Sequence, residues 1–353
     1  MVTFSSSEEG WDCLQCCLER VREGVDAPLV PVIGSGLHLW AGLPKQSPVT
    51  DWYELLRQVS QHLKLGDFPL EALKDFPTLA WDAMMVTAAR NSGKAAHQVE
   101  AVARKWVRQV IENDVEDRIT PAMNHYRTFA ELPWRHVISL NFDALWVQYG
   151  LGGSVELLPR LFASSRQRIA LRCRVICKDD QRQMTVWYPH GALSLPGSIC
   201  LGLRDYGGLM PQANAAFVHY KAWERQQLPE NPAVYDLSPQ EWRPVREKLQ
   251  GLLASDQSDS PVSSVSLMLT HPLIFIGCGL SQSEWGLWWV LNQRQRNLAR
   301  VGYREPSVFA LMNSENRNEF WNSHPAGVVP LWCDNWDAGW RRMSEMIGSS
   351  SFQ

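Results

Sequence analysis

Four short segments of the sequence place glycine or polar side chains directly after apolar runs, where they could carry chemistry. The first is Gly34-Ser35-Gly36, which follows the apolar run 29–33. Glycine lets a backbone approach a phosphate closely, and the unpaired N–H groups at the start of a helix attract anions. The same pattern also occurs in ordinary turns between a strand and a helix. No third glycine completes a dinucleotide fingerprint here, so the pattern alone leaves both interpretations open.

The second segment carries Asn141 and Asp143, directly after the predicted buried strand 134–140. Short polar side chains after a strand commonly cap the next helix, which is one interpretation of this pair. The other is that both side chains face a ligand at the edge of a sheet.

The third segment is His190 with Gly191, after the strand-like run 184–188. A histidine titrates near neutral pH, so His190 is a candidate general base. A turn histidine bonded only to backbone is the alternative.

The fourth segment is Gly277-Cys278-Gly279, which ends the apolar run 273–276. In a parallel sheet the carboxyl ends of the strands lie along one edge, and ligands bind in the crevice there. We therefore expect the four segments to surround one ligand.

Apolar runs and helical spacing alternate along the chain, and this alternation predicts the elements that position those residues. It predicts an α/β fold with a Rossmann-like, doubly wound, mostly parallel sheet. A single domain over residues 1–353 is expected, with helical insertions at about 50–130 and 207–262. The predicted strands are 29–33, 134–140, 169–177, 184–188, 199–203, 273–276, 307–311 and 328–332. The predicted helices outside the insertions are 8–24, a short one from 144, a long one from 283, and 336–347.

The composition of the chain sets limits on its function. Of 353 residues, 45% are hydrophobic and 20% charged, and the net charge of -3 gives no electrostatic reason to expect direct nucleic-acid binding. No apolar segment is long enough to span a membrane, and residues 1–10 lack a secretory apolar core, so we expect a cytoplasmic protein. The eight cysteines form no paired C-x-x-C motifs, so no structural zinc and no other metal is expected.

Tryptophan is unusually abundant, at 17 residues. Several lie at helical spacing in 283–300 and 336–347. Such residues either fill a core or form a surface for self-association, and the sequence leaves both open.

The order of the four segments resembles the sirtuin family. The resemblance is carried by G-S-G-L-H-L-W-A-G-L-P at 34–44, S-L-N-F-D at 139–143, P-H-G at 189–191 and I-G-C-G-L-S at 276–281. Two further blocks, T-D-W-Y-E-L-L at 50–56 and C-L-G-L-R-D-Y at 200–206, are similar to the bacterial NAD-hydrolase branch found in antiphage defence.

The resemblance implies a sheet that binds NAD+ and an active site that cleaves the bond between nicotinamide and ribose. It implies that Asn141 holds the nicotinamide ribose and positions water, and that His190 is the general base. The expected binding residues are Gly34, Ser35 and Gly36 at the pyrophosphate, Asp143 at the nicotinamide, and Gly277, Cys278 and Gly279 under the adenosine ribose.

The sequence also departs from the deacylating members of the family. Lys45-Gln46-Ser47 replaces their aspartate-phenylalanine-arginine segment, and no four-cysteine zinc ribbon follows His190. Both departures favour hydrolysis of NAD+ over deacylation. His38 stands where the family usually has a small residue; a contact with phosphate and a place at the rim of the pocket are the two interpretations.

We therefore expect an NAD+ glycohydrolase that acts by NAD+ depletion in abortive infection. Such an activity must be silent by default, which implies a homo-oligomer or a sensor partner such as an ATPase ring or an Argonaute-like protein. Two alternatives stay open: an NAD-dependent protein deacylase or ADP-ribosyltransferase, and an inactive nucleotide-binding module that signals by assembly.

Overall fold

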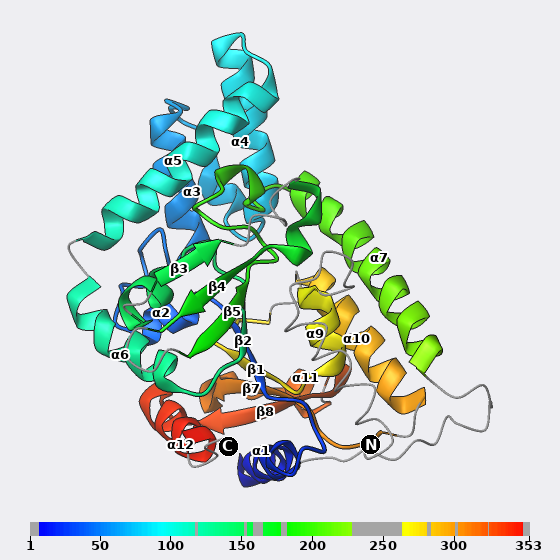
Figure 1. Ribbon diagram of the computed structural model, residues 1–353. Helices are drawn as coiled ribbons and strands as arrows, with labels where there is room; N and C mark the ends of the chain where they lie inside the picture. The colour runs from blue at the N-terminus through cyan, green and yellow to red at the C-terminus, as the bar shows by residue number, and fades with distance from the viewer. Residues whose placement is uncertain are drawn as a thin grey trace.

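A computed structural model of the chain describes residues 7–116, 119–151, 154–157, 165–177, 182–227, 263–280, 284–300, 303–323 and 325–348. Its centre is an eight-stranded sheet in the order β3-β4-β5-β2-β1-β6-β7-β8 (Figure 1). The strands are β1 (Val30–Ile33), β2 (His136–Ser139), β3 (Ser154–Leu157), β4 (Arg172–Ile176), β5 (Gln183–Trp187), β6 (Leu273–Ile276), β7 (Val308–Asn313) and β8 (Val328–Cys333).

Six of the strands, from β5 to β8 in the sheet order, pair in parallel. Only β3 and β4 run antiparallel to their neighbours, at one edge. The chain leaves β1 toward β2 on one side and leaves β6 toward β7 on the other, so the direction of winding reverses between β1 and β6. The predicted Rossmann-like α/β fold is confirmed.

Helices cover both faces of this sheet. Alternate residues of β1 enter different clusters: Ile33 packs in the larger core, while Val30 and Val32 pack in the smaller one. This two-sided burial explains why β1 is an uninterrupted apolar run. The larger core includes α1 (Ser7–Arg22) and α12 (Trp336–Gly348); the smaller includes residues of α7 (Leu203–Gln227), α9 (Ser264–Thr270) and α10 (Trp285–Arg300).

The predicted helical insertion after β1 is helical throughout its described residues, apart from short connections. It consists of α2 (Gly36–Trp40) at its entry, then α3 (Trp52–His62), α4 (Pro77–Ser92), α5 (Ala96–Glu116) and α6 (Ile119–Glu131). Helices α4 and α5 extend away from the sheet at the top of Figure 1. Of the second predicted insertion, α7 reaches Gln227, and residues 228–262 lie outside the described part.

Two of the predicted elements are wrong. Residues 199–203 form no strand: Ile199 and Leu201 are fully buried in a loop, and α7 already begins at Leu203. The side chain of Asp205 accepts hydrogen bonds from the backbone N–H groups of Leu201 and Gly202, which fixes that loop against the helix. The helix expected from residue 144 is a short π-helical turn, Trp146–Leu151.

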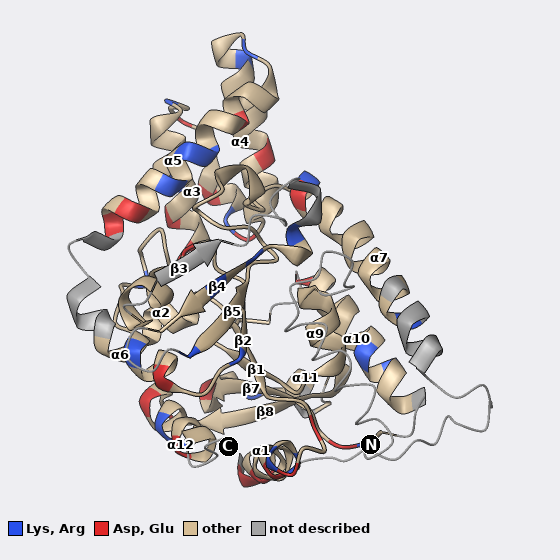
Figure 2. Cartoon of the chain, viewed as in Figure 1, with Lys and Arg blue, Asp and Glu red and all other residues tan. Residues whose placement is uncertain are grey.

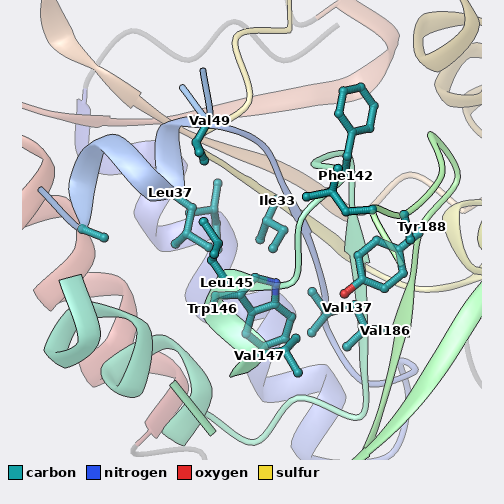
Figure 3. Packing of buried hydrophobic residues seen from close by; sticks show 14 of the residues in the cluster. Ile33, Leu37, Val49, Val137, Phe142, Leu145, Trp146, Val147, Val186 and Tyr188 are labelled. Carbon is teal, nitrogen blue, oxygen red and sulfur yellow. The ribbon is translucent and has the colours of Figure 1, made fainter. Parts of the chain in front are cut away.

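The larger core lies directly beneath the carboxyl ends of β1 and β2. Figure 3 shows Ile33 and Leu37, the residues on either side of the first segment, packing near Leu145 and Trp146. Trp146 is fully buried, so the backbone that carries Asn141 and Asp143 continues into a dense apolar anchor. Among the described helices, none has the length and apolar character needed to cross a membrane.

Candidate functional site

A cavity of about 210 Å³ opens at the carboxyl ends of β1, β2 and β6, next to the point where the winding reverses. Open α/β sheets commonly bind their ligands at this place. The lining combines all four predicted segments with part of α3: Gly34, Ser35, Thr50, Asp51, Trp52, Leu140, Asn141, Phe142, Asp143, His190, Tyr206, Gly277, Cys278, Gly279 and Glu284 are among its residues.

The first and fourth segments are packed directly against each other. The Gly34 N–H donates to the carbonyl of Ile276 at 3.0 Å, and the Gly36 N–H donates to the carbonyl of Gly277 at 2.9 Å. Gly277 has a φ of +64°, and a Cβ there would lie 2.3 Å from the backbone nitrogen of Leu37. These glycines therefore allow two strand ends to approach closely.

That packing changes the expected role of the turn. The N–H groups of Gly34 and Gly36 are already bonded to β6, so neither is available to a phosphate. Gly36 is not among the residues that line the cavity, whereas Gly34 and Ser35 are. Within the described backbone, the Ser35 N–H is the group of this turn that makes no backbone hydrogen bond. The structure thus brings Ser35 to the ligand side and puts Gly36 behind it.

A buried hydrogen-bond network lies under the second segment. His38 is 0% exposed, and its two ring nitrogens contact different partners. Nδ1 is 2.7 Å from the Tyr126 hydroxyl, while Nε2 is 3.1 Å from Asp143 Oδ2 and 3.0 Å from Asn141 Nδ2. Both interpretations of His38 from the sequence are wrong, since a fully buried ring neither contacts phosphate nor lies at the rim.

Asp143 fixes the hydrogen positions in this network. Burial alone would raise the pKa of Asp143, but the charge of His38 and hydrogen bonds from His38 and the Leu145 N–H lower it below its usual value. An ionised carboxylate only accepts, so Nε2 of His38 carries a hydrogen and donates it to Asp143. Nδ1 forms the other hydrogen bond of the ring, with the Tyr126 hydroxyl.

The same ring positions Asn141. The side-chain Nδ2 of Asn141 lies 3.0 Å from Nε2 of His38, so this contact fixes the Asn141 amide at the border of the cavity. Asp143 itself is 3% exposed, so it acts mainly through this network, and also caps the following turn.

His190 borders the same cavity from the end of β5. Burial lowers the pKa of His190; the charge of Glu284 and a hydrogen bond with the Leu140 backbone oppose this, and the charge of Arg168 adds to it. The net direction is downward, so the imidazole is neutral at pH 7 and able to accept a proton.

Tyr206 and Glu284 are among the cavity residues that were not predicted as site residues from the sequence. The ring of Tyr206, in the first turn of α7, packs against His190 with ring centroids 5.4 Å apart. Glu284, just before α10, is the acidic group that acts on His190. Tyr206 lies in the 200–206 block that carries the resemblance, which could have indicated it; Glu284 has no signal in the sequence.

Cys278 lines the cavity but does not have the properties of a reactive thiol. Burial raises the pKa of Cys278 far above the usual range, and its thiol donates to the Val32 carbonyl at 3.3 Å. Over the part of the chain that the structure describes, no cluster of three or more His, Cys, Asp or Glu side chains is arranged to hold a metal ion.

Together these groups supply orientation and a proton acceptor. Asn141 offers an amide to a bound ligand, His190 offers a neutral imidazole, and the Ser35 N–H and the glycine backbone of 277–279 offer a surface that a ligand can approach closely. The enclosed 210 Å³ is below the roughly 300–1,000 Å³ of typical ligand pockets, so a dinucleotide would extend beyond it along the open edge of the sheet.

Comparison with known proteins gives no family to which the chain can be assigned. No protein-family model matches it, and no curated protein matches it at a significant level.

Proposed function

We propose that the chain is an NAD+ hydrolase that cleaves the bond between nicotinamide and ribose to give nicotinamide and ADP-ribose. The observation that carries this proposal is that Asn141 and Asp143, which follow β2, and His190, which follows the neighbouring strand β5, border one cavity at the switch point of a Rossmann-like sheet. The order of the motifs along the sequence, which is similar to that of sirtuins, supports NAD+ as the substrate.

The reaction requires the protein to orient NAD+ and water and to provide a base. Nicotinamide leaves NAD+ as a neutral molecule, and the ribose carbon develops the character of an oxocarbenium ion. Water adds at that carbon and loses one proton, so that NAD+ and water become nicotinamide, ADP-ribose and H+. A neutral His190 accepts that proton, either from water or through a ribose hydroxyl.

Asn141 orients the reacting groups in this scheme. Its side-chain amide forms a hydrogen bond with a ribose hydroxyl or with the attacking water, and the contact with His38 holds the amide in place. A correctly held pair of reactants contributes much of an enzyme's rate enhancement. The Ser35 N–H and the backbone of Gly277 to Gly279 would face the phosphate and adenosine parts of the dinucleotide.

In the cell this activity would serve as an antiviral effector in the cytoplasm. Uncontrolled NAD+ cleavage would kill the cell that produces the enzyme, so the activity must be released only on infection. We propose that a homo-oligomer or a partner protein that senses infection, such as an ATPase ring or an Argonaute-like protein, releases the activity. The experiment is to express the wild type, Asn141→Ala and His190→Ala, and to measure cellular NAD+ before and after phage challenge.

We expect NAD+ to fall only with the wild type, while all three proteins accumulate to equal levels. Equal depletion by all three would refute the assignment of the site. Unchanged NAD+ with the wild type, in cells that the protein protects, would favour an inactive assembly module instead.

A second candidate has one structural observation in its favour. A small, mostly apolar cavity of about 70 Å³ shares His190 with the first cavity and has Leu209, Met210 and Met268 in its lining. Such a cavity suits an acyl chain, as an NAD-dependent deacylase would require. Consumption of an acylated peptide in step with NAD+ would distinguish this activity from hydrolysis, which releases nicotinamide without any second substrate.

A further inference from the structure

A second and larger cavity lies on the other side of the first turn of α7. Its volume is about 770 Å³, and none of its lining residues borders the first cavity. Helix α5, the loop before α7 and the first turns of α7 surround it, and Figure 2 shows charged positions on α5 and at the beginning of α7. The lining consists of His97, Glu100, Ala101, Arg104, Lys105, Arg168, Pro196, Gly197, Arg204, Asp205, Gly208 and Gln212.

Two buried arginines share a single carboxylate in this cavity. Arg104 Nη2 is 2.6 Å from Asp205 Oδ2, and Arg168 Nη2 is 2.7 Å from Asp205 Oδ1. Arg104 also pairs with Glu100 at 2.6 Å and donates to the Ile199 carbonyl. Arg168 is 9% exposed, and its Nε has no hydrogen-bond partner among the described residues.

The exposed part of the lining adds positive charge. Lys105 and Arg204 are exposed, and neither forms an ion pair within the described part of the chain. The four Lys and Arg side chains of the lining thus face two carboxylates, those of Glu100 and Asp205. Asp82 lies outside the lining and accepts a hydrogen bond from the Leu203 N–H. When its negative charge is counted as well, the four cations exceed the three carboxylates by one.

We propose that this cavity is a second binding site, which takes a phosphate-bearing small molecule of about nucleotide size. The planar guanidinium groups of Arg104 and Arg168 match the geometry of phosphate oxygens, and the exposed side chains of Lys105 and Arg204 add two cations to the lining. The volume of 770 Å³ falls within the roughly 300–1,000 Å³ common for small-molecule sites.

A ligand in this second site can affect His190 through neighbouring residues. Asp205, which the two arginines hold, is adjacent in sequence to Tyr206, whose ring packs on His190. A phosphate bound to Arg104 and Arg168 competes with Asp205 for them and partly neutralises Arg168. The ligand is therefore a regulator of the first cavity, a part of the inference that rests on the proposed function.

The effect on His190 has a defined direction. The charged groups that act on His190 are Arg168, which lowers its pKa, and Glu284, which raises it, beside the uncharged ring of Tyr206. A bound phosphate reduces the effect of Arg168, so the pKa of His190 is expected to rise when the second site is filled.

Binding is tested by calorimetric titration of the full chain with inorganic pyrophosphate at constant ionic strength. Four proteins are compared: the wild type, the double variant Lys105→Ala with Arg204→Ala, the control Lys94→Ala, and Asn141→Ala in the first cavity. Lys94 is an exposed lysine just before α5 that does not line the cavity. We expect the double variant to bind about tenfold more weakly or worse, and both other variants to bind as the wild type does.

Equal binding by the double variant, or loss of binding in Asn141→Ala, would overturn the second site. The coupling is tested by NMR titration of the His190 ring, assigned with His190→Gln, with and without pyrophosphate. The coupling is supported if pyrophosphate raises the pKa of His190 in the wild type but not in the double variant. An unchanged pKa of His190 in the wild type contradicts the coupling. Neither readout needs NAD+ cleavage, so failure of the proposed function would show separately, as absence of nicotinamide release.

Discussion

The network around His38 shows how a buried side chain that does not line the cavity can fix the position of residues that do. His38 connects the Tyr126 hydroxyl, on α6, with Asp143 and Asn141, at the end of β2. The Tyr126 hydroxyl and the Asp143 carboxylate hold the ring in one orientation, and the ring in turn fixes the position of the Asn141 amide. We therefore regard His38 and Tyr126 as positioning residues.

Removal of the Tyr126 hydroxyl tests this role. Tyr126→Phe leaves Nδ1 of the fully buried His38 ring without its hydrogen-bond partner, at a cost of about 1–3 kcal/mol in unfolding free energy. We expect kcat for nicotinamide release to fall about tenfold while KM changes less, because Asn141 is no longer held in one orientation. Steady-state kinetics and thermal unfolding measure the two effects.

Tyr149→Phe is the matched control, since no hydrogen bond of the Tyr149 hydroxyl occurs within the described residues. An equal loss of kcat in both variants would show that the hydroxyl of Tyr126 has no specific role.

The charge of Glu284 gives a second prediction at this scale. Glu284 raises the pKa of His190, so Glu284→Gln lowers it further. A base is active when deprotonated, so the acid limb of the rate profile should move to lower pH in the variant. The measurement is nicotinamide release between about pH 5 and 8. Glu112→Gln, which changes an exposed carboxylate on α5, should leave the profile in place, and a shift to higher pH in Glu284→Gln would contradict the assignment.

The strand ends are the elements on which the site depends, and they were largely predictable from the sequence. The runs that form β1, β2 and β6 are apolar and end abruptly in glycine or asparagine, so their place in a parallel sheet could be read directly. The run 199–203 has the same composition but forms a buried loop, because a loop held by Asp205 buries apolar side chains as well as a strand does. The local pattern of apolar residues does not distinguish a buried strand from a buried loop.

The tertiary contacts of the site were not predictable in this way. His38 meets Tyr126 across 88 positions of sequence and Asp143 across 105, and these encounters depend on where α2 and α6 pack. Likewise, the sequence indicated that the glycines at 34–36 approach something closely, but only the structure shows that the neighbour of Gly36 is Gly277.

A pair of glycine substitutions tests the close approach of β1 and β6. Gly277→Ala puts a Cβ 2.3 Å from the Leu37 nitrogen at a φ of +64°, which requires the strand ends to separate. We expect a loss of about 1–3 kcal/mol or more in unfolding free energy. Gly279→Ala meets no atom within 4 Å and should unfold as the wild type does. Equal midpoints of denaturant unfolding for the two variants would rule out the close packing of these turns.

At the scale of the whole molecule, most of the unusual tryptophan content is explained by the core. Trp11, Trp81 and Trp134 are almost fully buried, and Trp340 of α12 is 5% exposed. Trp336 of the same helix is 39% exposed and is available for contact with another molecule. Trp340 of α12 thus fills the core, while a role of Trp336 in self-association stays a prediction.

Acid stability is a property of the molecule that the structure also predicts. Burial and the charges of Arg172 and Arg135 lower the pKa of His136 from 6.5 to about 4. The unfolded chain therefore binds more protons between these two values, and the free energy of unfolding decreases as the pH falls from 6.5 toward 4. Denaturant unfolding across this range should show a shallower pH dependence for His136→Gln than for the wild type. An unchanged slope would assign the acid sensitivity to other groups.

The central claim is that the cavity at the carboxyl ends of β1, β2 and β6 cleaves NAD+. Its most direct test is the release of nicotinamide and ADP-ribose from NAD+ by the purified wild type, by Asn141→Ala and by His190→Gln. We predict equal amounts of the two products from the wild type, and a rate at least about 100-fold lower from both variants at an unchanged unfolding temperature. Intact NAD+ with the wild type, or equal release by all three proteins, would contradict the account.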